Sequence, residues 1–175
     1  MEKKLHEPVL DSLVQAEVDP KLRQQARQLA ESCVGLTLPL VQRHGDLHPS
    51  NLLFQNGRLH AVVDWEKASV NSWPLFDWLQ FLFEYHWEIT RTRHPSNNRE
   101  RNLKITVDTL FDVSSSKREH GHHWTELMLS HYGLPLATAP LWWLKYASLV
   151  EWSGDKRAFL TVVVPAVIRW AGWAV

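Results

Sequence analysis

The stretch RHGDLHPSNLLF, residues 43–54, places a carboxylate, an amide and two imidazoles in one short segment that then turns apolar. Either Asp46 or Asn51 alone would be explained by a turn, because aspartate and asparagine are common there. Together with the histidines they form a pattern that ordinary core or surface sequence has little reason to contain. The stretch therefore predicts a polar loop that carries chemistry.

The residues after this loop predict a β-hairpin. Apolar stretches at 52–54 and 59–63 flank the dipeptide Asn56-Gly57, which is the strongest short-range signal for a two-residue hairpin turn. The second strand ends at Asp64, so the hairpin brings another carboxylate back toward the loop. We therefore expect loop and hairpin to form one unit.

The remaining sequence predicts helices. Asp19 and Pro20 are suited to the N-cap and first position of a helix that ends near Gly35. A helix over about 74–91 is apolar around nearly its whole circumference, which predicts that it is buried. Further helices are expected at 98–111, 122–132, 136–152 and, kinked at Pro165, 158–175.

Size and pattern together predict a single domain of the α+β class that is mainly α-helical, with a small β-hairpin set into it. A chain of 175 residues is long enough to bury a core of its own. We assign residues 1–19 to a lead-in segment and residues 20–175 to the domain.

The charges exclude some partners. Nineteen basic and nineteen acidic residues cancel, and no basic run is interleaved with aromatics, so a nucleic-acid partner is not expected.

Cys33 is the only cysteine, which excludes an internal disulfide and favours a reducing compartment such as the cytoplasm. The most apolar stretch contains Pro165 and Arg169 and is short for a bilayer span, so no transmembrane segment is expected and peripheral membrane contact is a minor alternative.

The loop and hairpin meet the needs of phosphoryl transfer. That reaction needs a carboxylate beside the acceptor hydroxyl, to orient it and take its proton, and oxygen ligands for magnesium. Asp46 at the acceptor, with Asn51 and Asp64 on two sides of the metal, satisfies both needs. The sequence therefore predicts Mg²⁺ as a cofactor, and the family resemblance described next implies ATP as the phosphoryl donor.

Three segments carry a resemblance to a known family. The segments HGDLHPSNLLF, VVDWE and PLFDW resemble, in this order, the catalytic core of the aminoglycoside phosphotransferase and choline kinase family, which has a protein-kinase-like fold. The resemblance implies that residues 20–175 are the C-terminal lobe of that fold. It also implies roles for five residues: Asp46 as catalytic base, Asn51 and Asp64 as Mg²⁺ ligands, and His44 and Asp77 as structural support.

Other residues near the motif leave alternatives open. His48 either contacts the phosphates or fixes the loop. Glu66 either contacts the groups that bind the metal or is a solvated turn carboxylate. Aromatic residues of the later helices either pack in the core or stack on a sugar or cationic substrate. The aromatic candidates are Trp78, Tyr85, Trp142 and Trp143.

A kinase-like enzyme also has an N-terminal lobe, with a glycine-rich loop and a strand lysine that contact the phosphates. No G-x-G-x-x-G motif occurs in this sequence, and the segment before the loop predicts a helix. We therefore expect the N-terminal lobe to be absent and the isolated chain to bind nucleotide weakly. The face that normally meets that lobe should be apolar and prone to self-association.

The function expected is an ATP-dependent phosphotransferase lobe that acts on a hydroxyl of a small substrate, such as an aminoglycoside, a choline-like amino alcohol or a sugar. A non-catalytic kinase-like interaction module is the first alternative. A metal-dependent hydrolase is the second, with His44, Asp46, His48 and Asp64 as ligands. The hydrolase is less favoured because it assigns no role to Asn51.

Overall fold

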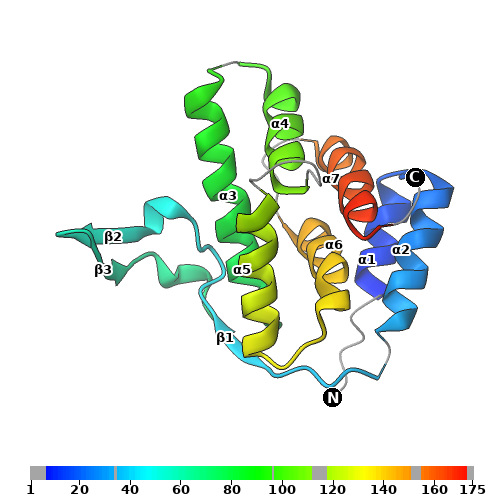
Figure 1. Cartoon of the computed structure of the whole chain (residues 1–175), viewed down its shortest axis with the longest axis horizontal. Helices are drawn as coiled ribbons and strands as arrows, with labels where there is room; N and C mark the ends of the chain where they lie inside the picture. The colour runs from blue at the N-terminus through cyan, green and yellow to red at the C-terminus, as the bar shows by residue number, and fades with distance from the viewer. Residues whose placement is uncertain (1–6, 34, 96, 112–117, 151–154, 173–175) are drawn as a thin grey trace.

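The architecture of the chain is a body of helices from which a segment of short strands extends (Figure 1). The computed structural model describes residues 7–33, 35–95, 97–111, 118–150 and 155–172. These residues are mainly helical and include two small antiparallel sheets, which confirms the expected mainly α-helical α+β class.

Two helices precede the polar loop. Helix α2 spans Pro20–Ser32, and the Asp19 carboxylate caps it by accepting hydrogen bonds from two backbone N–H groups of its first turn. Helix α1 spans Glu7–Gln15, in the segment expected to be a lead-in. Its buried Val9 and Leu13 are four residues apart, so they share one face, which packs against helix α6. Helix α1 therefore packs as part of the helical body.

The later helices lie close to their predicted positions. They are α3 at Phe76–Arg93, α4 at Arg99–Phe111, α5 at Arg118–His131, α6 at Ala139–Leu149 and α7 at Lys156–Trp170. Residues 136–138 form a short 3-10 helix rather than the start of α6. Residues 151–152 and 173–175 of the predicted helices lie outside the described residues. None of the described helices has both the length and the apolar character that crossing a membrane requires.

Helix α6 is the centre of the body, because it contacts α1, α2, α3, α5 and α7. Every residue from Ala139 to Ser148 is buried. Trp142 and Trp143 are each 2% exposed, and Trp143 meets Phe111 edge-on at 5.0 Å between ring centroids. Of the two alternatives that the sequence left open for Trp142 and Trp143, the structure favours packing in the core, because a helix enclosed on all sides presents no ring face to a ligand.

The strands form what we call the site segment, residues 41–72. Strands β2 (Leu52–Gln55) and β3 (Arg58–Val62) form the predicted hairpin, and both residues of its Asn56-Gly57 turn have positive φ, as that turn type requires. The hairpin points away from the helices (Figure 1).

A second sheet closes the base of the site segment. Strand β1 (Val41–Arg43) pairs antiparallel with β4 (Ser69–Ser72), and Arg43 lies opposite Ser69. The two ends of the intervening chain, residues 44 and 68, are therefore neighbours. The loop that begins with His44 is brought beside the residues that follow the hairpin.

Candidate functional site

The start of the polar loop is attached to the helical body by the carboxylate of Asp77. Asp77, in the first turn of α3, accepts hydrogen bonds from the backbone N–H groups of His44, at 2.6 Å, and Gly45, at 2.9 Å. A carboxylate is also favoured at this position by the partial positive charge of a helix N-terminus. Asp77 thus sets the place where the loop leaves strand β1.

His44 joins the loop to the end of the hairpin. Its Nε2 lies 2.8 Å from the carbonyl oxygen of Val63, and its Nδ1 accepts a hydrogen bond from the backbone N–H of Asp46 at 3.3 Å. Only the tautomer with the proton on Nε2 satisfies both contacts. The buried ring therefore has neither nitrogen left for a metal, and the hydrolase alternative loses one of its four ligands in this arrangement.

Asn51 lies between the loop and the residue that precedes Asp64. Its Nδ2 donates to the backbone oxygen of Asp46 at 2.9 Å, and its backbone oxygen accepts from the N–H of Val63 at 3.0 Å. Asn51 is buried, whereas Asp64 is exposed and adopts the left-handed conformation at φ 66°. This backbone bond thus places Asn51 beside Val63, the residue that precedes Asp64 in the chain.

The donor atoms of these two residues fit magnesium. Because the Asn51 Nδ2 is engaged with the loop, the amide oxygen is its atom available to a metal, and Asp64 adds carboxylate oxygens. Magnesium prefers such oxygen ligands and usually keeps water or phosphate oxygens at its other positions. Among the described residues, no group of three or more His, Cys, Asp or Glu is placed to hold a metal ion.

The carboxylate of Asp46 is held on both oxygens. Lys67 Nζ lies 2.9 Å from Oδ2, and Gln80 Nε2 donates to Oδ1 at 3.1 Å. Burial by itself would raise the pKa of Asp46, but the hydrogen bond and charge of Lys67, with help from His48 and Gln80, lower this pKa below its usual value. Asp46 is therefore ionised at neutral pH.

Neither Lys67 nor Gln80 was among the site residues predicted from the sequence. The sequence does contain a clue to Gln80, because this polar residue lies three positions after Asp77 in an otherwise apolar part of α3 and so shares its face. It contains none to Lys67, since the contact of this residue with Asp46 depends on how two separate segments pack.

That packing requires a glycine. Gly45 has φ +85°, and a Cβ atom at this position would collide with the backbone carbonyl of Lys67. The backbone of a short 3-10 helix, Trp65–Lys67, therefore rests directly on the polar loop. A side chain at position 45 would push the two apart.

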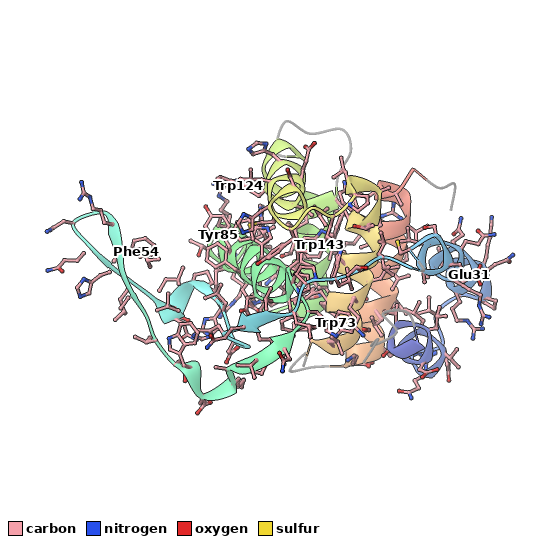
Figure 2. The ribbon with its side chains drawn as sticks, turned by 90° about the horizontal axis from the view of Figure 1, so that it is seen from below. Glu31, Phe54, Trp73, Tyr85, Trp124 and Trp143 are labelled. Carbon is pink, nitrogen blue, oxygen red and sulfur yellow. The ribbon has the colours of Figure 1, made fainter. Side chains whose placement is uncertain are left out.

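The other predicted residues lie on the polar loop, on the short 3-10 helix and on helix α3. His48 Nδ1 is 2.6 Å from the Ser50 hydroxyl, and Glu66 is exposed on the 3-10 helix. Trp78 is half-buried and Tyr85 is exposed, and Phe81 stacks between them with ring centroids 5.9 Å and 6.1 Å away. Figure 2 shows Tyr85 and Trp124 on the same side of the molecule, and Trp143 among the helices.

Comparison with known proteins gives one match. A model described as the phosphotransferase enzyme family matches residues 2–108, which include the polar loop, the hairpin and α3. The searches of curated proteins and of solved structures found no significant match.

Proposed function

Because this chain belongs to the phosphotransferase enzyme family, we propose that it is the catalytic, C-terminal lobe of a protein-kinase-like enzyme. The proposed reaction transfers the γ-phosphoryl group of ATP to a hydroxyl of a small molecule. The observation that carries the proposal is the hydrogen-bonded unit in which Asp46, Asn51 and the strand end before Asp64 meet.

Asp46 is the proposed catalytic base. Its carboxylate accepts the proton of the substrate hydroxyl while the hydroxyl oxygen forms a bond to the γ-phosphorus and the bond from phosphorus to ADP breaks. The carboxylate is ionised at neutral pH, so it can accept a hydrogen bond from the hydroxyl and orient it. Gln80, on Oδ1, holds the carboxylate in position from the helical body.

Asn51 and Asp64 are the residues that would hold Mg²⁺. When bound, this ion would neutralise charge on the phosphates of ATP. His44 and Asp77 act as positioning residues, because their contacts keep the loop and the hairpin end together. His48 lies between Asp46 and Asn51 in the sequence, and Glu66 follows Asp64 by two positions. We propose that they contact the phosphates or, through water, the metal.

The acceptor that we propose is a small alcohol such as an aminoglycoside, a choline-like amino alcohol or a sugar. Trp78 and Tyr85 are the proposed aromatic contacts for it. They lie on α3, the helix that also carries Gln80, and Tyr85 is 46% exposed. An exposed ring of this kind can stack on a sugar face or hold a cationic group.

The hairpin is the proposed contact for a nucleotide-binding upper lobe. Its apolar Leu53, Phe54 and Leu59 are between 46% and 63% exposed, which is unusual for neighbouring large apolar side chains. Phe54 lies on the part of the hairpin that projects from the body (Figure 2). Sedimentation of the isolated chain tests the alternative occupant, a second copy, because self-association through this face would raise the apparent mass with concentration.

The test of the proposed function combines binding and turnover. We expect the chain to bind MgATP weakly by NMR titration, and Asp46→Asn to lower phosphoryl transfer by about 10²- to 10⁴-fold, as removal of a general base does. The melting temperature should change little. Asp108→Asn, which neutralises an exposed carboxylate on α4, is the matched control and should leave turnover unchanged.

Two results would contradict the proposal. A chain that does not bind MgATP even at millimolar concentration would favour the non-catalytic interaction module. Turnover that survives Asp46→Asn would remove this residue from the role of base.

A further inference from the structure

The two groups that hold Asp46 differ in their surroundings. Gln80 is 9% exposed and reaches Asp46 from the helical body. The Lys67 side chain is 53% exposed and reaches the other carboxylate oxygen from the side open to solvent. One contact therefore comes from a buried side chain, and the other from a side chain that is open to solvent.

The backbone of Lys67 is fixed even though its side chain is exposed. Trp65, two residues earlier, donates its indole N–H to the Val62 carbonyl at 2.7 Å, and its ring lies 4.5 Å from that of His44. The Lys67 carbonyl rests against Gly45. A lysine side chain has four flexible carbons, so its ammonium can move by rotation about single bonds without disturbing this backbone.

A phosphoryl donor needs a cation at this place. Its terminal oxygens carry negative charge and must approach the ionised Asp46, which repels them. Lys67 places a positive charge 2.9 Å from the carboxylate of Asp46.

We propose that Lys67 is a phosphate-binding residue that contacts the terminal phosphoryl group of a nucleoside triphosphate while it remains beside Asp46. The inference rests on the proposed function and adds a residue to it. An ammonium has three N–H donors, so it can bridge a carboxylate and a phosphoryl oxygen. Lys67 then aligns the donor phosphorus with the hydroxyl that Asp46 orients.

The contact is tested by comparing nucleotides that differ in one phosphoryl group. MgATP and MgADP are titrated into the chain with no acceptor present, and binding is followed by the NMR signal of the Trp65 indole N–H. The variants are Lys67→Met, which removes the charge, and Lys67→Arg, which keeps it. Lys21→Met removes an exposed charge from α2 and is the matched control.

We expect Lys67→Met to weaken MgATP binding by about tenfold, the effect of losing one charged hydrogen bond, and to leave MgADP binding unchanged. Lys67→Arg should retain the preference for MgATP, and Lys21→Met should behave like the wild type. A residue with only a structural role would change both affinities together.

The outcomes separate this inference from the proposed function. Failure of the wild-type chain to bind either nucleotide overturns the proposed function and the inference with it. Equal affinity of the wild type for MgATP and MgADP overturns the inference alone, as does a preference that persists in Lys67→Met. Loss of the preference in Lys67→Arg would also overturn it, because the contact would then not depend on charge.

Discussion

The helical body and the site segment are held together by different forces. In the body, large side chains such as Phe83 and Phe159 are 1% exposed or less, and helix α6 is enclosed on all sides. In the site segment, Phe54 is 63% exposed, and the contacts that fix the geometry are hydrogen bonds between side chains and backbone. Burial, which is not directional, stabilises the body, whereas directional bonds place the reactive groups.

The helical body therefore provides most of the stability, and the site segment provides the polar groups of the candidate site. A net hydrogen bond contributes only about 1 kcal/mol, so the site segment adds little stability for the number of contacts it contains. Its link to the body runs through α3, where Asp77 holds the loop and Gln80 holds the carboxylate of Asp46. The body thus provides a rigid helix on which a small polar network is built.

The largest effect is expected from a matched pair of phenylalanines. Phe83→Ala should destabilise the chain by about 3–5 kcal/mol, because it leaves a cavity in the core. Phe83 meets the ring of Phe159 edge-on at 5.5 Å. Phe54→Ala, in the exposed hairpin, should change stability by less than about 0.5 kcal/mol.

Urea denaturation followed by circular dichroism measures both variants. Equal losses would contradict the contrast between body and site segment. They would indicate that the hairpin packs against something in solution, and a concentration series would then show whether this is a second copy.

A smaller effect is expected from a matched pair of glycines within the site segment. Gly45→Ala and Gly57→Ala both place a side chain at positive φ, which costs about 1–2 kcal/mol. Only position 45 adds a collision with the Lys67 carbonyl, whereas a Cβ at position 57 has no heavy atom within 4 Å. Gly45→Ala should therefore lose more stability.

The Trp65 indole signal gives an independent measure of this difference. The chemical shift of this signal should change in Gly45→Ala, because the 3-10 helix is displaced from the loop. It should stay the same in Gly57→Ala. Identical behaviour of the two variants would show that the packing of Lys67 on Gly45 is not what sets the geometry.

The smallest effect is expected at Glu84, a partly buried carboxylate of α3 where the two regions meet. Burial raises its pKa, the charges of Glu88 and Asp46 raise it further, and Arg99 opposes them. The folded state thus binds this proton more tightly than the unfolded state, so ionised Glu84 costs stability at neutral pH. Glu84→Gln should stabilise the chain at pH 7.

The pH dependence checks the sign of this effect. The gain should shrink as the pH falls through the raised pKa and vanish below the usual value for glutamate of about 4.3, where both states are protonated. Urea denaturation at several pH values measures it, with Asp108→Asn as a control for net charge. A gain of the same size at all pH values would have another cause.

The elements predicted correctly depend on neighbours in the sequence. The hairpin follows from its Asn-Gly turn, the start of α2 from Asp19 and Pro20, and the helix at 99–111 from its apolar pattern. Helix α1 was missed because it is short and its apolar face becomes evident only against α6. Strand β4 was missed because SVNS has little strand character until it pairs with β1.

The sequence by itself determined the chemical groups, most of the local elements and the family, since these depend on residue types at short spacing. Only the tertiary structure decided which groups meet. Lys67 and Gln80 reach Asp46 across 21 and 34 positions, and Asp77 reaches His44 across 33. Tertiary structure also placed Trp142 and Trp143 in the core rather than at a substrate. The physical reason is that a hydrogen bond requires heavy atoms about 3 Å apart in the right direction, and over such separations only the packing of one element on another supplies that precision.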